Sequence, residues 1–191
     1  MKEISIGLIG AGTVGGGVIK VLNNRLKAIR EDMGLPLKLA RVADKVTSRF
    51  KDLPVGDALC TSEAQDIIDD PSIDIVIELI GGTTFAKKVV LAALKAKKHV
   101  ITANKALIAE YGPEIFECAG QNGVSFYFEA SVGGGMPIIK TIREGLVGNN
   151  VLSIKTIING TCNYILTKMS HDGLPFETVL KQAQEKGYAE A

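Results

Sequence analysis

Short apolar runs alternate with longer amphipathic stretches in the first part of the chain. Residues 4–9 form an apolar run without strict polar alternation, which is typical of a strand in a parallel sheet covered on both faces. Apolar residues then recur at helical spacing from Val14 to Leu26, and Gly34 is placed to end that helix. Residues 37–43 are expected to form a second strand that ends at Asp44. This pattern predicts a strand, a helix and a second strand.

The alternation of strands and helices continues to about residue 130. β-Branched runs predict strands, helical spacing predicts helices, and clusters of proline, glycine and aspartate predict loops. Strands that alternate with helices predict an α/β fold with a doubly wound parallel sheet. The expected elements are a loop at 50–61, a short helix with a capping box of Ser62 and Gln65, strands at 73–80, 99–102 and 124–129, and helices at 85–96 and 113–121.

The pattern changes after residue 130. A glycine-rich stretch at 131–137 leads into a helix that ends near residue 145, and an alternating run at 151–158 predicts a strand of a second sheet. One strand and the helices that follow it cannot bury both faces of a sheet. We therefore expect residues 1–130 to form one domain and residues 131–191 to form the incomplete beginning of a second, α+β domain. The helices expected after the strand are at 164–169 and 176–186.

Composition and charge narrow the class of protein. Basic and acidic residues nearly balance, 22 against 21, and neither a Lys/Arg block nor an aromatic-basic pattern marks a nucleic-acid surface. No apolar run is long enough to span a bilayer and the N-terminus lacks a signal-peptide pattern, so we expect a cytoplasmic protein without nucleic-acid or membrane partners. Cys60, Cys118 and Cys162 are odd in number and widely spaced, which argues against disulfides or a zinc site and favours buried thiols.

A glycine turn joins the first strand to the first helix and reads G-x-G-x-x-G. The first glycine permits a tight turn, the second lets the backbone approach a pyrophosphate, and the third lets the helix lie close to the sheet. Free N–H groups at the helix start would bind the phosphates of NAD(P)(H). A glycine turn of this kind between a strand and a helix predicts a sheet of the Rossmann type. The alternative is a glycine turn that binds nothing. The candidate cofactor-binding residues here are Gly10, Ala11, Gly12, Thr13, Val14 and Gly15.

An acidic residue follows the second strand. In dinucleotide-binding folds a carboxylate at this place accepts hydrogen bonds from the adenosine ribose and repels a 2′-phosphate, so Asp44 favours NAD. Lys45, Arg41 and Arg49 lie close enough in the sequence to hold a phosphate instead, so the choice between NAD and NADP stays open. Asp44 could also begin an ordinary solvated turn.

Two further strand ends carry candidate site residues. Gly81 and Gly82 follow the strand at 73–80, where small residues either let a cofactor approach the backbone or form the entry to a helix. Lys105 follows the strand at 99–102. A lysine that is desolvated at this edge has a lowered pKa suited to proton transfer, although an ordinary surface lysine fits the sequence as well.

The glycine-rich stretch at 131–137 lies directly after a carboxylate, Glu129. Its backbone carbonyls and the Glu129 carboxylate could hold a hard cation through oxygen ligands. Alternatively, the glycines let the loop pass close to the nicotinamide of a cofactor. The sequence leaves both interpretations open.

Six separated stretches of the chain occur in the order found in one known family. They are the glycine turn at 10–15, Glu-Leu-Ile-Gly-Gly ending at Gly82, Val-Ile-Thr-Ala-Asn-Lys ending at Lys105, Phe-Glu-Ala-Ser-Val-Gly-Gly-Gly-Met-Pro ending at Pro137, Ile-Asn-Gly-Thr-Cys-Asn-Tyr ending at Tyr164, and Gly-Tyr-Ala-Glu-Ala ending at Ala191. Together they resemble the N-terminal part of homoserine dehydrogenase. The resemblance implies reversible NAD(P)-dependent hydride transfer between L-homoserine and L-aspartate 4-semialdehyde, in threonine, methionine and isoleucine biosynthesis. It also implies a homodimer or homotetramer.

The resemblance assigns roles to individual residues. Lys105 matches the family's lysine at the cofactor and substrate, which implies a catalytic role. Glu190 matches the carboxylate that binds the substrate's amino group, and Gly187 falls where the family's backbone meets the cofactor. The family's cation loop, which usually holds sodium, maps onto Glu129, Val132, Gly134 and Met136.

The sequence departs from the family at a few positions and at its end. Gly133, Met136 and Cys162 replace residues that are commonly Ala, Ile and Thr. The family's Asp-Pro segment, its substrate-binding aspartate and its second lysine would follow Ala191, so we expect a fragment of a longer enzyme that is itself inactive. Two other interpretations are another NAD(P)-dependent semialdehyde reductase, acting through a thioester at Cys162, and a nucleotide-sensing module without chemistry.

Overall fold

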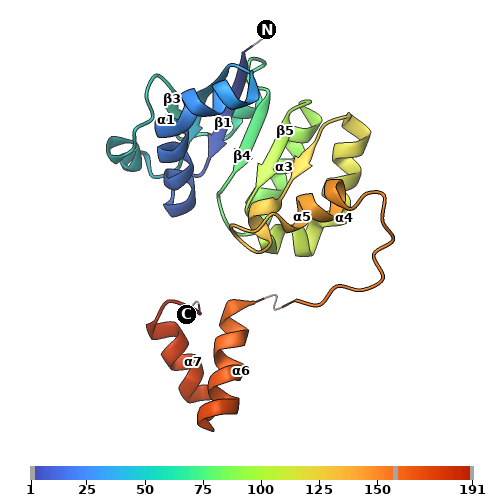
Figure 1. Cartoon of the computed structure of the whole chain (residues 1–191). Coiled ribbons are helices and arrows are strands. Elements are labelled where there is room, and N and C mark those ends of the chain that lie inside the picture. Colours follow the sequence, from blue (N-terminus) through green and yellow to red (C-terminus); the bar gives the residue numbers. More distant parts are fainter. Residues whose placement is uncertain (1–2, 157–158, 190–191) are drawn as a thin grey trace. The chain divides into compact units, whose positions relative to one another are not determined.

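The chain divides into two compact units, Met1–Arg143 and Glu144–Ala191, in a computed structural model that describes residues 3–156 and 159–189 (Figure 1). The first unit holds the sheet and the second holds a helical pair. These units are defined by contacts within the chain. The boundary expected from the sequence, at 130/131, refers instead to cofactor-binding and substrate-binding domains. That boundary stays a prediction.

The first unit is built on a parallel sheet of six strands in the order β3-β2-β1-β4-β5-β6. All five strand pairings are parallel, which confirms the predicted doubly wound sheet. The predicted loop at 50–61 is wrong at its end, because β3 pairs there with β2; a three-residue, largely exposed edge strand has little apolar pattern to reveal it. The strands are β1 (Ile4–Ile9), β2 (Leu37–Ala43), β3 (Leu59–Thr61), β4 (Ile75–Glu78), β5 (His99–Thr102) and β6 (Phe126–Tyr127).

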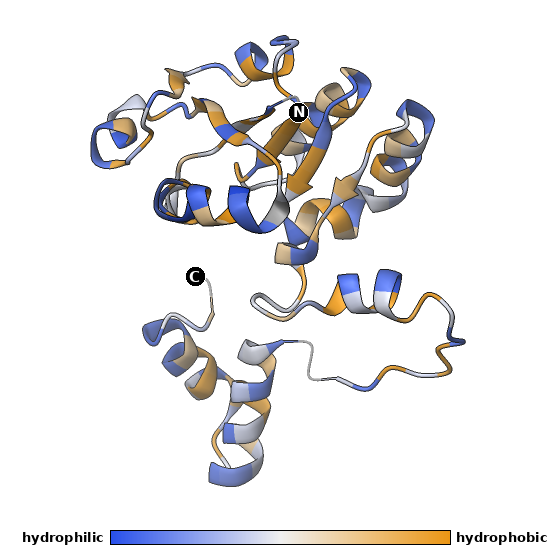
Figure 2. Ribbon diagram, turned by 45° about the horizontal axis from the view of Figure 1, so that its top comes forward, coloured by the Kyte–Doolittle hydropathy of each residue, from blue (hydrophilic) through white to orange (hydrophobic). Residues whose placement is uncertain are grey.

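Helices cover both faces of this sheet. One face packs against α1 through Ile19, which is fully buried with Leu8 and Val42. The other face packs against α2, α3 and α4, whose buried residues include Leu94 and Leu107. Figure 2 shows the matching hydropathy, with apolar residues concentrated in the strands. The helices are α1 (Thr13–Met33), α2 (Gln65–Ile68), α3 (Thr84–Lys95) and α4 (Lys105–Asn122), with a 3-10 helix at Thr47–Asp52.

The fourth helix begins earlier than the sequence predicts. The expected helix starts near Pro113, but α4 starts at Lys105 and contains Pro113 in its interior. The start is fixed by Asn104, whose side-chain oxygen accepts a hydrogen bond from the N–H of Leu107 at 3.0 Å. Proline is most common in the first turn of a helix, but α4 accommodates Pro113 in its interior.

The capping box predicted for the short helix α2 is also wrong. Its N-cap is Ala64, which makes no side-chain capping bond, and the Ser62 hydroxyl donates to the Glu63 carboxylate at 3.1 Å. The helix is held instead by the burial of Ile67 and Ile68 against the sheet.

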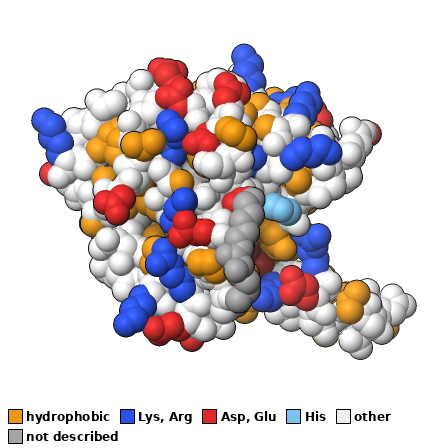
Figure 3. Space-filling model, turned by 90° about the horizontal axis from the view of Figure 1, so that it is seen from above, with side chains coloured by type: hydrophobic (Ala, Val, Ile, Leu, Met, Phe, Trp, Pro, Cys, Tyr) orange, Lys and Arg blue, Asp and Glu red, His pale blue; other side chains and the backbone are white. Residues whose placement is uncertain are grey.

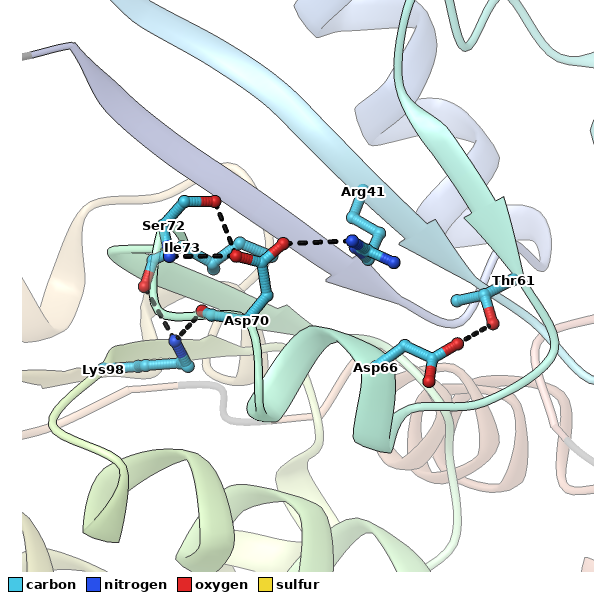
Figure 4. Close-up of polar contacts among 7 residues, drawn as sticks. All are labelled: Arg41, Thr61, Asp66, Asp70, Ser72, Ile73 and Lys98. Atoms are coloured by element: carbon cyan, nitrogen blue, oxygen red, sulfur yellow. Dashed lines mark hydrogen bonds and ion pairs between the residues drawn. The ribbon is translucent and has the colours of Figure 1, made fainter.

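A buried lysine ties the loop before β4 to the end of α3 (Figure 4). The ammonium of Lys98 donates to the carbonyl oxygens of Asp70 at 2.6 Å and Ile73 at 2.9 Å. Lys98 is 3% exposed, and burial lowers its pKa although the charge of Asp70 opposes the shift. The Asp70 carboxylate accepts from the Ser72 hydroxyl at 2.6 Å and pairs with Arg41 at 3.2 Å. These contacts fix the entry to β4.

Charged side chains of both signs are mixed over the face of the molecule that Figure 3 shows. Some of these opposite charges form ion pairs in the first unit, for example Lys45 with Glu63 at 2.8 Å and Lys87 with Glu114 at 2.7 Å. Within the described parts of the chain, no helix combines the length and the apolar character needed to cross a membrane.

The second unit is a pair of helices, α6 (Gly160–Asp172) and α7 (Phe176–Glu185). Its small core is formed by Ile165, Val179 and Ala183. Asn159 caps α6 by accepting a hydrogen bond from the N–H of Cys162 at 2.9 Å, so the helix begins earlier than the predicted residue 164. The predicted strand at 151–158 is not found in residues 151–156, because a strand needs a hydrogen-bonded neighbour and no described residue pairs with this segment; residues 157–158 lie outside the described residues.

Candidate functional site

The turn between β1 and α1 has the backbone geometry that its glycines predict. Gly10 has a φ of +100°, a conformation that residues with a side chain rarely adopt, and a Cβ there would lie 2.4 Å from the carbonyl oxygen of Leu79. A Cβ at Gly15 would lie 1.8 Å from the carbonyl oxygen of Gly10. The chain therefore requires glycine at both ends of the turn.

The middle glycine of the turn faces open space. A Cβ at Gly12 would meet a single atom within 4 Å, the guanidinium Nη1 of Arg49 at 4.0 Å. Gly12 is also the N-cap of α1, and no side chain caps this helix. The first N–H groups of α1 are thus available to an anion such as a phosphate, which is the arrangement that a dinucleotide site needs.

The turn borders a cleft of about 440 Å³ at the carboxyl ends of the strands. Eight residues named as candidates from the sequence line this cleft: Gly10, Gly12, Thr13, Val14, Asp44, Lys45, Arg49 and Gly81. Ser62 and Phe85 also line it, although the sequence did not mark them as site residues. A cleft of this size at the end of a parallel sheet is typical of a ligand site.

Asp44 holds the glycine turn rather than beginning a solvated turn. It is 8% exposed, and its carboxylate accepts hydrogen bonds from the N–H groups of Ala11 at 2.7 Å and Val46 at 2.7 Å and from Arg49 at 2.9 Å. Burial alone would raise the pKa of Asp44, but these hydrogen bonds and the Arg49 charge outweigh burial and lower the pKa below its ordinary value. The ionised carboxylate therefore stabilises the turn.

Replacing Asp44 by asparagine is expected to lower the free energy of unfolding by about 2 kcal/mol at neutral pH, because an amide offers one acceptor oxygen where two are used. The folded-state pKa lies below the ordinary 3.8, so this stabilisation is complete above pH 3.8 and is lost as the pH falls through the folded-state pKa. Urea unfolding from pH 7 to pH 2 should show the difference between Asp44 and Asp44→Asn narrowing in acid. The exposed Asp57, changed to asparagine, is the control; a difference that is constant with pH would contradict the role of Asp44.

Two cations lie at the Asp44 side of the cleft. Lys45 is exposed, and its ammonium makes two hydrogen bonds of 2.8 Å to the Glu63 carboxylate. Arg49 pairs with Asp44 but keeps 47% of its side chain exposed. A ligand in the cleft could reach the exposed part of Arg49 directly, whereas reaching Lys45 would require breaking its ion pair with Glu63.

Lys105 lies at the start of α4 and is exposed, so the expected desolvation is not seen. It is not among the lining residues of the cleft, but its neighbour Asn104 donates to the carbonyl oxygen of Gly82 at 2.6 Å. Gly82 has a φ of +68°, and Gly81 before it lines the cleft. The loop after β4 and the start of α4 are thus joined at the edge of the sheet where the glycine turn lies.

The segment of the expected cation loop forms two short turns in the first unit, a 3-10 helix at Glu129–Ser131 and the helix α5 (Ile138–Lys140), which runs into a π-helical turn. The Glu129 carboxylate accepts from the N–H of Ile139 at 3.0 Å and of Lys140 at 2.8 Å. Both oxygens of Glu129 thus accept a hydrogen bond, and the carbonyl oxygen of Met136 accepts one from the N–H of Ile138 at 2.9 Å. Across residues 3–156 and 159–189, no three His, Cys, Asp or Glu side chains are placed to hold a metal ion.

The second unit contains the remaining candidates. Gly187 has a φ of +71°, and the next residue, Tyr188, packs edge to face on Tyr164 with ring centroids 5.2 Å apart. Glu190 lies outside the described residues. Cys162 is exposed, and His171 lies nine residues further along α6, about 13 Å by helical rise, so it does not activate the thiol.

Cys60 is exposed as well, and Cys118 is buried, so the prediction of three buried thiols is wrong for two of them. Cys60 lies on the edge strand β3, and Cys162 lies in the first turn of α6. The exposure of a cysteine depends on its place in the fold, which the spacing of cysteines along the chain cannot show.

The strand order, the glycine turn and the cleft together define an NAD(P)-binding α/β protein of the Rossmann type. A family model described as "Homoserine dehydrogenase, NAD binding domain" matches residues 10–129, and one described as "Homoserine dehydrogenase" matches residues 137–191. The chain belongs to the homoserine dehydrogenase family.

Relatives of this family are similar over the whole chain. The homoserine dehydrogenases of Bacillus subtilis and Pseudomonas aeruginosa are 44% and 46% identical to it over 191 residues. The crystal structure of a homoserine dehydrogenase from Thiobacillus denitrificans is 46% identical, with a TM-score of 0.88 over 100% of this chain. In each case the chain spans 44% of the length of the relative.

Proposed function

We propose that the protein containing this chain is an NAD(P)-dependent homoserine dehydrogenase, which transfers hydride reversibly between L-homoserine and L-aspartate 4-semialdehyde. The observation that carries the proposal is the position of three features after three neighbouring strands. The glycine turn follows β1, Gly81 and Gly82 follow β4, and Lys105 follows β5, and these strands are adjacent in the sheet. A cofactor on the glycine turn would therefore reach a lysine at the same edge.

Each group of the site has a part in this reaction. The N–H groups at the start of α1 would bind the pyrophosphate, and the bound nicotinamide would accept or give the hydride. Lys105 would accept the hydroxyl proton of the alcohol during oxidation and would donate a proton to the carbonyl oxygen in the reverse direction. Glu190 would bind the substrate's amino group, and Gly187 would contact the cofactor through its backbone.

Steady-state oxidation of L-homoserine by the full-length protein, with NAD and NADP in turn, tests the proposal. Formation of NADH or NADPH that depends on L-homoserine is the expected result. Tight binding of the cofactor without any turnover would overturn it in favour of a nucleotide-sensing module. Acyl transfer that is lost in Cys162→Ser would instead indicate a thioester mechanism.

The position of Arg49 supports a preference for NADP. Both oxygens of the Asp44 carboxylate already accept hydrogen bonds from the protein, and the Arg49 guanidinium is left facing the cleft. Arg49→Ala is expected to raise the KM for NADP about tenfold and the KM for NAD less than about threefold, because a charge-assisted bond to the 2′-phosphate is lost. The exposed Lys51, changed to alanine, is the control. Equal changes of both KM values would refute the preference.

Three further properties form part of the proposal. The cation loop would hold sodium largely through the carbonyls of Val132, Gly134 and Met136, with Glu129 orienting the loop through α5.

The exposed apolar residues Val147, Leu152 and Ile154 would be covered in a homodimer or homotetramer. The protein would act in the cytoplasm on small-molecule substrates, in threonine, methionine and isoleucine biosynthesis.

A further inference from the structure

A buried carboxylate stands at the end of β4, behind the proposed reaction edge. Glu78 is 0% exposed although it follows three apolar residues of the same strand. One of its oxygens accepts the N–H of Ile80 at 2.7 Å, and the other accepts the hydroxyl of Thr102 at 2.6 Å. An apolar side chain of the same size would be easier to bury but would leave both donors unpaired. The contacts of the carboxylate, rather than its packing, therefore explain its presence.

The contacts of Glu78 continue through Thr102 to both loops of the reaction edge. The Thr102 hydroxyl oxygen accepts the N–H of Asn104 at 3.0 Å. The Asn104 side chain then donates to the carbonyl of Gly82 at 2.6 Å and caps α4 by accepting from Leu107 at 3.0 Å. The result is one chain of hydrogen bonds from the interior of the sheet to the loop after β4 and to the first turn of α4.

The two segments that this chain of hydrogen bonds reaches, the loop after β4 and the first turn of α4, both contain proposed site residues. The loop after β4 contains Gly81, which lines the cleft, and Gly82. The first turn of α4 begins with Lys105, the residue directly after Asn104. A shift of about 1 Å at a reacting group can cost a hundredfold in rate, so a rigid support at this place affects catalysis more than stability.

We propose that Glu78 is a positioning residue of the dehydrogenase, which acts through Thr102 and Asn104 to hold Lys105 and the Gly81–Gly82 turn in register with the nicotinamide. This inference rests on the proposed function. Glu78 and Thr102 act as a unit, because each is satisfied by the other across neighbouring strands. Removing either one should therefore have the effect of removing both.

The test compares Glu78→Gln, Thr102→Val and the double variant in the full-length protein. Each single variant is expected to lower the kcat for L-homoserine oxidation about 10- to 100-fold, while the dissociation constant for NADPH changes less than about threefold. The double variant should be no slower than the slower single variant, since the two changes break the same link. Valine suits a buried strand position, so Thr102→Val tests the link even where Glu78→Gln is poorly folded.

Two controls separate positioning from a general loss of structure. Thr102→Ser keeps the hydroxyl and should recover most of the kcat that Thr102→Val loses. Rates are expressed per site that binds NADPH, so unfolded protein does not count. A kcat within about threefold of the unchanged protein in Glu78→Gln and Thr102→Val, or strictly additive losses in the double variant, would overturn the positioning role alone. If the unchanged protein does not oxidise L-homoserine, the proposed function fails, and this inference fails with it.

Discussion

Replacing Lys105 by alanine in the full-length protein is expected to lower the kcat for L-homoserine oxidation about a thousandfold, the middle of the range for loss of a general acid or base. Lys105 is exposed at the edge of the sheet and is not a lining residue of the cleft beside the glycine turn. The dissociation constant for NADPH should therefore change less than about fivefold, because the phosphates are held elsewhere. Steady-state rates and a fluorescence titration with NADPH measure the two quantities.

Lys20, an exposed lysine of α1, provides the matched control for this experiment. Lys20→Ala removes the same charge from a surface away from the carboxyl edge of the sheet and should leave kcat and cofactor affinity unchanged. Equal, small effects of the two variants would remove Lys105 from the mechanism. Loss of cofactor binding in Lys105→Ala would assign this lysine to the cofactor rather than to the proton transfer.

Replacing Gly15 by alanine is expected to weaken NADPH binding about a hundredfold and to destabilise the first unit by about 3 kcal/mol. The new Cβ would lie 1.8 Å from the carbonyl oxygen of Gly10, and both partners of this contact belong to the backbone of the turn. The turn must open, which moves the first N–H groups of α1 away from the pyrophosphate. A loss of about 3 kcal/mol of phosphate binding would weaken affinity for NADPH roughly a hundredfold.

Gly17 supplies the control, because it lies two residues further along the same helix and has no atom within 4 Å of an added Cβ. Gly17→Ala should raise stability by about 0.5–1 kcal/mol, since alanine favours the helix, and should leave NADPH affinity unchanged. Thermal unfolding and the titration distinguish the two variants. If Gly15→Ala bound NADPH as well as Gly17→Ala, the close packing of the turn would have no part in the cofactor site.

The sequence predicts the first strand, the first helix and the second strand with little error because their signals are local. The strand Ile4–Ile9, the helix that ends at Met33 and the strand Leu37–Ala43 are found at the predicted residues. The first strand is marked by its apolar run and by Gly10 after it, and the helix is marked by its helical spacing and by Gly34 at its end. The role of Gly15 follows from the same short stretch, since its close contact is with the carbonyl oxygen of Gly10, whereas the contact of Gly10 with the distant Leu79 does not.

Features that depend on distant residues could not be predicted in this way. The edge strand β3 and the missing strand at 151–156 are decided by the presence or absence of a hydrogen-bonded neighbour, which local pattern does not contain. Asp44 was correctly placed at the end of β2, but its bonds to the glycine turn join residues 33 positions apart. The bond between Glu78 and Thr102 spans 24 positions, and an acidic residue in an apolar strand was its one visible sign.

A titration of the full-length protein with NADPH and NADH, followed by nicotinamide fluorescence, tests the central claim most directly. That claim is that the turn at 10–15 presents main-chain N–H groups to the diphosphate of a nicotinamide dinucleotide. We expect saturable binding with a dissociation constant of about 1 μM to 1 mM for at least one of the two, weakened about a hundredfold in Gly15→Ala and kept in Gly17→Ala. The absence of saturable binding of either dinucleotide, or an undiminished affinity in Gly15→Ala, would contradict this claim.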